Sequence, residues 1–112
     1  MHATRQADFN TAYTRILAQG KPAMTGESCL YTTPDGLHCG IGMLMTNDEL
    51  AIMGGRCGDV ASLDIPRFND DIEFYTDLQN SHDDAGVYAE DFIVGFKERM
   101  EAVAIDYDLE IP

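Results

Sequence analysis

The sequence predicts an α+β domain, in which a small β-hairpin or sheet packs against three main helices. Amphipathic periodicities near both ends of the chain predict the longest helices, and a Pro-Asp-Gly turn between short apolar runs predicts the hairpin. The chain has 112 residues. This length fits a single domain over residues 1–112, because domains cluster near about 100–150 residues.

An amphipathic helix is predicted first, over residues 5–19. Gly20 suits the left-handed conformation that ends many helices, and Pro22 prevents the helix from continuing. The apolar stripe at i, i+3, i+4, i+7 and i+8 consists of Phe9, Ala12, Tyr13, Ile16 and Leu17.

A β-hairpin is predicted over residues 29–41. Pro34 and Gly36 occupy positions that a tight turn favours, since proline presets φ and glycine tolerates a positive φ. A three-residue loop with a glycine bulge pairs Thr33 with Leu37. This register gathers the apolar side chains on one face, which a two-residue loop would not do. That face consists of Cys29, Tyr31, Leu37, Cys39 and Ile41.

The middle of the chain carries weaker signals. Residues 40–45 are apolar and either begin a short buried helix or carry the hairpin into the core. Thr46 and Glu49 have the spacing of a capping box, which predicts a short helix through Ile52. Glycines then predict a long surface connection over residues 54–68.

Two further helices are predicted in the C-terminal part. The first covers residues 69–82 with Asn69 as its cap, and Gly86 separates it from the second, over residues 88–107. A short extended tail follows. The stripe of the last helix consists of Ala89, Phe92, Ile93, Phe96, Met100, Val103 and Tyr107.

Charge is distributed unevenly along the chain. Twenty acidic and seven basic residues give a formal net charge of −13. Residues 1–46 hold three of each and are neutral, whereas residues 47–112 hold seventeen acids and four bases. Solubility of a small domain needs a net charge of only about 2–8. The asymmetry therefore points to a partner chosen by charge, with a solubilising surface as the alternative.

The charge also excludes classes of partner. Phosphate backbones and anionic membranes attract clustered Lys and Arg, so we expect neither direct nucleic-acid binding nor membrane binding. The N-terminus lacks the apolar core of a secretory signal, and no apolar run approaches the ~20 residues of a membrane span. Three cysteines without a dense framework suit a reducing compartment. These features predict a cytoplasmic protein.

Acidic residues recur at helical spacing in the last two predicted helices. Like charges at such spacing destabilise an isolated helix by about 0.2–0.5 kcal/mol per pair. A rigid anionic surface can occupy a basic groove and exclude nucleic acid from it. We therefore predict binding to a basic host or defence-system protein. The predicted partner-binding residues are Asp70, Glu73, Asp77, Asp83, Asp84, Glu90, Asp91, Glu98 and Glu101.

An enzymatic alternative centres on Cys39 and His82. A helix beginning at Gly40 would lower the pKa of the thiol through its dipole, and Asp83 could orient His82 as a base. The competing interpretation, which we favour, places Cys39 in the core as a small hydrophobe and His82 there as a hydrogen-bonded side chain.

Metal binding is a further alternative. Cys29, Cys39, Cys57 and His82 could together supply zinc ligands, but no Cys-x-x-Cys pair is present. The acids at Asp106, Asp108 and Glu110 lack the glycine of an EF-hand loop. We therefore expect no metal and no cofactor.

Three short blocks resemble a family of small phage and prophage proteins with no assigned activity. They read Cys-Leu-Tyr at 29–31, Gly-Leu-His-Cys-Gly-Ile-Gly at 36–42 and Leu-Gln-Asn-Ser-His-Asp-Asp at 78–84. Gly40 stands where the family usually has Ala, and Thr46-Asn47-Asp48 stands where it has Pro-Asp. The resemblance implies a phage context and supplies no chemistry.

Charge and resemblance together predict a phage-encoded inhibitor. Its target would be a basic host protein that handles nucleic acid, or a defence protein of a CRISPR or restriction system. The alternatives are a small Cys-His enzyme centred on Cys39 and His82, and a structural or assembly accessory of a phage.

Overall fold

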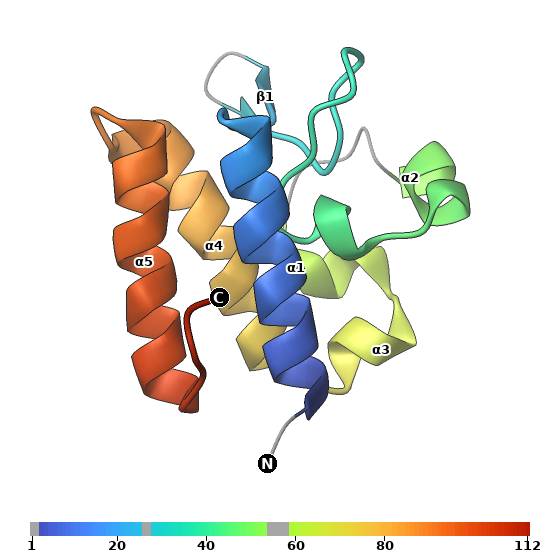
Figure 1. The fold of residues 1–112 in the computed structure, drawn as a ribbon. Helices are drawn as coiled ribbons and strands as arrows, with labels where there is room; N and C mark the ends of the chain where they lie inside the picture. The colour runs from blue at the N-terminus through green and yellow to red at the C-terminus, as the bar shows by residue number, and fades with distance from the viewer. Residues whose placement is uncertain (1–2, 26–27, 54–58) are drawn as a thin grey trace.

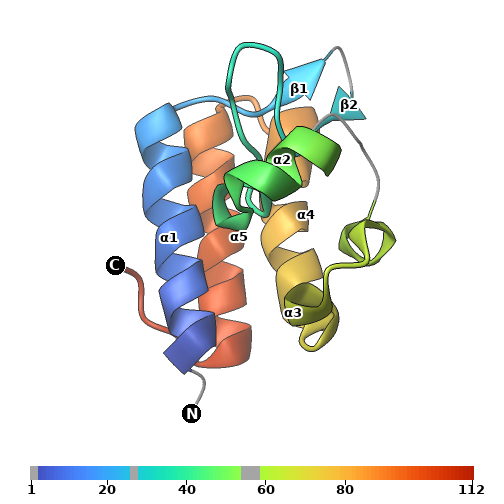
Figure 2. The same cartoon turned by 90° about the vertical axis from the view of Figure 1, so that its right-hand side faces the viewer.

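Three long helices frame the molecule in a computed structural model: α1 (Ala3–Gln19), α4 (Ile72–Tyr88) and α5 (Phe92–Tyr107). A short turn joins α4 to α5, which run antiparallel, and α1 packs against both (Figure 1). The short helices lie on the side of α1 and α4 that faces away from α5, and the two short strands lie at one end of the long helices (Figure 1 and Figure 2). The structure describes residues 3–25, 28–53 and 59–112.

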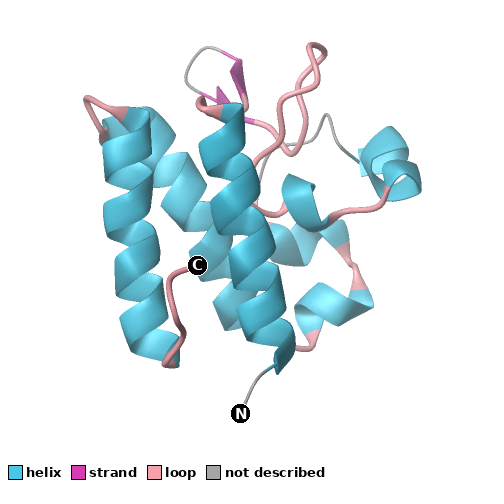
Figure 3. Cartoon of the chain, in the orientation of Figure 1, coloured by secondary structure: helices cyan, strands magenta, loops and turns pink. Residues whose placement is uncertain are grey.

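The predicted α+β class is wrong, because the described residues are predominantly helical (Figure 3). The sheet in the described residues consists of two antiparallel strands of two residues each, β1 (Met24–Thr25) and β2 (Ser28–Cys29). The segment predicted as the hairpin turns onto α4 instead. The backbone N–H of Ile41 donates to the Gln79 side-chain carbonyl at 3.1 Å. A helix side chain thus satisfies an amide that a strand ladder was predicted to satisfy.

The loop around the Pro-Asp-Gly turn keeps the predicted register. Thr33 N–H donates to the Leu37 carbonyl at 2.9 Å, and Cys39 N–H donates to the Tyr31 carbonyl at 3.2 Å. Gly36 has a φ of 87°, as the turn requires. Within this loop, Thr32 and His38 form an isolated antiparallel β-bridge. The predicted turn and register are therefore confirmed as far as Tyr31 and Cys39, within a loop, but Cys29 pairs with Met24 and not with Ile41 as predicted.

The predicted N-terminal helix is confirmed as α1. Phe9, Ala12 and Ile16 of its predicted stripe are fully buried. The helix ends at Gly20, whose N–H donates to the Ile16 carbonyl at 2.9 Å and whose φ is 79°. Glycine adopts this left-handed conformation without a steric cost, so the helix stops where its sequence predicts.

Two short helical segments follow the loop. The first is a 3-10 helix, η1 (Gly42–Leu44), and the second is α2 (Asn47–Met53). The capping box is confirmed: Thr46 N–H donates to the Glu49 carboxylate at 2.8 Å, and Glu49 N–H donates to the Thr46 hydroxyl at 3.2 Å. These two bonds satisfy free amides at the start of α2.

The prediction of a surface connection over residues 54–68 is wrong for its described part, residues 59–68. That part forms a 3-10 helix, η2 (Val60–Leu63), and a one-turn helix, α3 (Pro66–Asn69). Residues 54–58 lie outside the described residues. The helical turns of residues 59–68 bring apolar side chains into the core. The buried ones are Val60, Leu63, Ile65 and Phe68.

The prediction of a helix over residues 69–82, capped by Asn69 and separated by Gly86 from the next, is wrong at both ends. Asn69 is the last residue of α3, and α4 begins three residues later and continues through Gly86. A Cβ added at Gly86 would lie 2.8 Å from Met24 Sδ and 3.2 Å from Pro22 Cβ. Gly86 therefore lets the segment from Pro22 to Met24 approach α4 closely, and it does not break the helix.

The predicted helix over residues 88–107 corresponds to α5, which begins four residues later. Asp91 caps it, since its carboxylate accepts a hydrogen bond from Val94 N–H at 3.1 Å. The tail folds back toward α1, where Glu110 N–H donates to the Gln6 side-chain carbonyl at 2.9 Å. This contact joins the two ends of the described chain.

Candidate functional site

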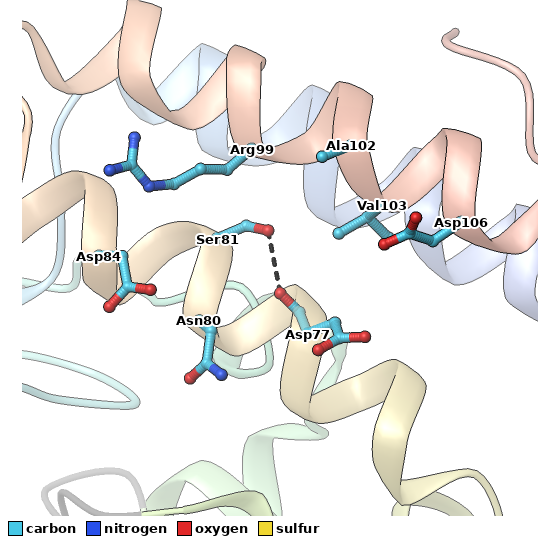
Figure 4. Close-up of a pocket in the computed structure, with 8 residues that line it drawn as sticks. All are labelled: Asp77, Asn80, Ser81, Asp84, Arg99, Ala102, Val103 and Asp106. Carbon is cyan, nitrogen blue, oxygen red and sulfur yellow. Dashed lines mark hydrogen bonds between the residues drawn. The ribbon is translucent and has the colours of Figure 1, made fainter.

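A groove of about 270 Å³ runs between α4 and α5 (Figure 4). Three aspartates line it, and Arg99 is the one cation in its described lining. We call this feature the acidic groove. Its lining residues are Asp77, Asn80, Ser81, Asp84, Arg99, Ala102, Val103 and Asp106.

Helical spacing aligns the polar side chains of the acidic groove. Asp77 and Asp84 lie seven residues apart on one face of α4, and Arg99 and Asp106 lie seven residues apart on α5. Because the two helices are antiparallel neighbours, their stripes face the same groove (Figure 4). Glu73 lines an adjoining hollow that shares Asp77, and it extends the row of carboxylates by about one turn.

Hydrogen bonds hold polar groups of the acidic groove in place, including one that the Ser81 hydroxyl donates to the Asp77 backbone carbonyl at 2.9 Å (Figure 4). Tyr107 donates its hydroxyl to Asp77 at 2.6 Å. Burial, and then this bond, raise the pKa of Tyr107, so the phenol remains a donor. Arg99 donates to the Gly95 carbonyl at 3.0 Å. Among the described residues, none donates a hydrogen bond to the exposed carboxylate of Asp84.

Two other arginines neutralise carboxylates away from the acidic groove. Arg5 pairs with Asp71 at 2.6 Å, and Arg67 pairs with Glu49 at 2.6 Å. The hydrogen bond from Arg67 holds the pKa of Glu49 down at about 2. Since each of these arginines is paired with another carboxylate and neither lines the acidic groove, they do not offset the charge of Asp84.

The nine predicted partner-binding residues do not form one surface. Seven are exposed, whereas Asp77 and Asp83 are half-buried. The prediction missed Asp106, which also lines the acidic groove. In the sequence, only its seven-residue spacing from Arg99, which places both on one face of α5, indicates this position. The structure brings Glu73, Asp77 and Asp84 together along α4. The other six lie elsewhere: Asp70 after α3, Asp83 beside His82, Glu90 and Asp91 in the α4–α5 turn, and Glu98 and Glu101 on α5 outside the acidic groove.

Cys39 is fully buried, with its sulfur accepting a hydrogen bond from Gly42 N–H at 3.2 Å. Burial raises the pKa of Cys39 to about 12. The thiolate is the nucleophile in cysteine catalysis, and it does not form near neutral pH at such a pKa. The segment after Gly40 forms the short η1, so the α-helix dipole proposed to activate the thiol is not in place.

His82 belongs to a buried hydrogen-bond network. Its Nε2 accepts from Ala23 N–H at 3.0 Å, and its Nδ1 contacts the Asp83 carboxylate at 2.7 Å. Gln79 donates to Asp83 at 3.0 Å and accepts from Ile41 N–H at 3.1 Å. The network fastens two distant backbone segments to α4. This geometry favours the core interpretation of His82 over its use as a base.

The zinc alternative gains no support from this geometry, because both ring nitrogens of His82 already have partners. Cys57 lies outside the described residues. Within the described ranges, no group of three or more His, Cys, Asp or Glu side chains is placed to hold a metal ion. Asp106, Asp108 and Glu110 lie within these ranges and therefore form no such group.

No family model, curated protein or solved structure matches the chain. The predicted phage origin therefore stays a prediction. None of the helices within residues 3–25, 28–53 and 59–112 combines the length and apolar character of a transmembrane segment.

Proposed function

We propose that this chain is a phage-encoded acidic inhibitor that acts in the cytoplasm of the host cell. It binds a basic protein that handles nucleic acid or defends the cell, and it blocks the nucleic-acid site of that protein. A CRISPR or restriction protein is the specific case. The proposal involves no catalytic step. The observation that carries it is the acidic groove, where Asp77, Asp84 and Asp106 share the described lining with one arginine.

The acidic groove has properties that a nucleic-acid site would recognise. Asp77 and Asp84 lie about 10 Å apart along α4, at about 1.5 Å per residue. Duplex DNA carries one negative charge per about 1.7 Å of its axis, so proteins that bind it present clustered Lys and Arg. The helices are anchored by buried side chains such as Phe74 and Phe96. Carboxylates on such helices need little ordering when they meet those cations.

The charge of the whole chain supports the same proposal. A net charge of −13 attracts a basic partner from beyond contact distance and raises the rate of association at low salt. The resemblance of residues 29–31, 36–42 and 78–84 to phage proteins supports the phage context. A role in solubility alone would not require carboxylates on two helices to face one groove.

Two variants with equal charge change test the proposal. The groove triple removes exposed carboxylates of the acidic groove and its extension but keeps Asp77, which Tyr107 needs as an acceptor. The control triple removes three exposed carboxylates near α2 and η2. The groove triple is Glu73→Gln, Asp84→Asn and Asp106→Asn, and the control triple is Asp48→Asn, Asp59→Asn and Asp64→Asn.

Each variant is expressed in bacterial strains that carry one defined CRISPR or restriction system, and the plating efficiency of a sensitive phage is measured. We expect the unmodified protein to protect the phage in at least one strain. The purified effector of that system should lose DNA binding when the protein is added at low salt. The groove triple should weaken this competition by more than tenfold, and the control triple by less than threefold.

Two results would contradict the proposal. Equal competition by the groove and control triples would show that the acidic groove is not the binding surface. If the protein protects the phage from none of the defence systems in the panel, the anti-defence function is rejected. Self-assembly of the protein without any host protein would then favour the structural or assembly alternative.

A further inference from the structure

Aliphatic side chains are exposed along the outward face of α5 and the tail that follows it. Ile105 is 81% exposed, Val94 53% and Ile111 43%. A second groove, of about 570 Å³, lies where the tail leaves α5, and we call it the tail groove. It is lined by Glu101, Ala104, Ile105, Asp108, Leu109 and Ile111.

Hydrogen bonds fix the tail that forms one wall of the tail groove. Asp108 turns the chain with a φ of 55°, and Leu109 N–H then donates to the Ala104 carbonyl at 2.8 Å. The backbone of Glu110 exchanges two hydrogen bonds of 2.9 Å with the side chain of Gln6 on α1. The tail turns back from the end of α5 and lies alongside α1 (Figure 1 and Figure 2). A ligand would therefore meet a wall that is already formed, which reduces the ordering cost of binding.

The charge around the tail groove restricts its occupant. Glu101 and Asp108 belong to the lining, and Glu98 lies one turn earlier on α5; all three are exposed. No Lys or Arg is present in the described lining. A second copy of this chain would bring a net charge of −13 to a surface that is already acidic. An occupant with both apolar and cationic side chains would complement the tail groove.

We infer that the tail groove binds an amphipathic, basic helical segment of the partner protein. The apolar side chains of that segment would contact Ile105 and Ile111, and its Lys or Arg side chains would meet Glu101 and Asp108. This is the helix-in-groove mode of recognition, with charge at the rim. The inference rests on the proposed function, to which it adds a second contact with a chemistry different from that of the acidic groove.

The probe is a synthetic peptide of about 14 residues, which is four helical turns. It carries Leu at i, i+3, i+4 and i+7 and Lys elsewhere, and a control peptide has the same composition without an apolar face. Binding to the full chain is followed by backbone amide chemical shifts and by titration. We expect the largest shifts near Ile105 and Ile111, and a weaker interaction with the control peptide.

Matched variants separate the tail groove from general hydrophobic binding. Ile105→Ser should weaken binding of the amphipathic peptide by about tenfold or more, because it removes apolar area from the contact. Ile52→Ser removes the same side chain from α2, where Ile52 is 72% exposed, and it should leave binding within about twofold. Glu101→Gln should reduce binding at low salt and have little effect at high salt.

Equal effects of Ile105→Ser and Ile52→Ser, or shifts confined to the acidic groove, would overturn the inference while leaving the proposed function intact. A dimer that Ile105→Ser dissociates would also overturn it, since a second copy would then be the occupant. The proposed function fails separately, if the groove triple inhibits defence as well as the control triple does.

Discussion

The imidazole Nε2 of His82 accepts a hydrogen bond from the backbone N–H of Ala23 at 3.0 Å, although the two residues lie 59 positions apart. Because the acceptor nitrogen carries no proton, the proton of the neutral ring lies on Nδ1 and is donated to Asp83 at 2.7 Å. The ring is fully buried. His82 therefore holds the segment after α1 against α4, a structural role that depends on both nitrogens.

Replacing His82 by Ala should destabilise the protein by about 3 kcal/mol, because a buried amide loses its acceptor and a cavity opens. The free energy of unfolding in urea measures the effect. Asn80→Ala, at an exposed position on the same helix, should change stability by less than about 0.5 kcal/mol. Equal stability of the two variants would show that the His82 bonds contribute nothing.

Cys39 should resist alkylation in the folded protein at neutral pH. Its sulfur is buried, and burial raises the pKa of the thiol to about 12, so little thiolate forms. Iodoacetamide labelling followed by peptide mass mapping reports Cys39 separately from the other two cysteines. Labelling should become fast in denaturing urea. Fast labelling of Cys39 without denaturant would instead restore the Cys-His enzyme as an alternative.

Gly95 should not tolerate the usual replacement by Ala. An added Cβ would overlap the Ala89 Cβ, so the start of α5 would be pushed away from the α4–α5 turn. We expect Gly95→Ala to cost about 1–3 kcal/mol of stability, although Ala favours helices. Ala89→Gly should remove most of that cost in the double variant. Additive effects in urea denaturation would contradict the assigned contact.

Local signals predicted the structure best where the stabilising bonds are local. Thr46 and Glu49 satisfy each other's amides within four residues, and Gly20 ends α1 through its own backbone conformation. Gly86 misled the prediction, because its small size serves a contact with Pro22 and Met24 rather than a chain break. That contact joins segments more than sixty residues apart, and no local pattern reports it.

In the candidate site too, the sequence predicted the relationships within one helix and missed those that depend on tertiary packing. Periodicity correctly grouped Glu73 with Asp77 on one face of α4, but it wrongly included Asp70, which lies at the end of α3. Asp106 joins Glu73 and Asp77 only because α5 packs antiparallel to α4, which is a tertiary relationship. Asp83 was separated from the exposed carboxylates for a similar reason, as it points toward His82 and Gln79. The predicted hairpin fails after Cys39, where the Gln79 side chain of α4 accepts the hydrogen bond that Ile41 was expected to donate to a strand.

The ion pair of Glu49 with Arg67 should make stability depend on pH in the acid range. The pKa of Glu49 is lowered from 4.5 to about 2 in the folded protein, so its stabilising effect is complete above pH 4.5 and is lost as the pH falls to about 2. Glu49→Gln should reduce stability by about 1 kcal/mol or less at neutral pH, and the difference should vanish near pH 2.

Arg67→Gln provides the control for this prediction, since removing either partner breaks the pair. In that background, Glu49→Gln should have little further effect at any pH. Thermal unfolding between pH 2 and pH 7 measures both differences. A gap between the proteins that persists unchanged down to pH 2 would assign the stabilisation to the neutral capping bond with Thr46 instead.

The carboxylates of the acidic groove should lower the stability of the protein that carries them. Asp84 and Asp106 share one groove in a chain whose net charge is −13, so their removal relieves repulsion between like charges. The groove triple should therefore be more stable than the unmodified protein by about 1 kcal/mol at low salt, and the gain should shrink at about 1 M salt, where the Debye length is about 3 Å. The control triple, whose carboxylates lie on other elements, should gain less. Urea denaturation at the two salt concentrations measures both. If the groove triple gains no more than the control triple, the acidic groove carries no concentrated charge, and the electrostatic basis of the proposed inhibition is lost.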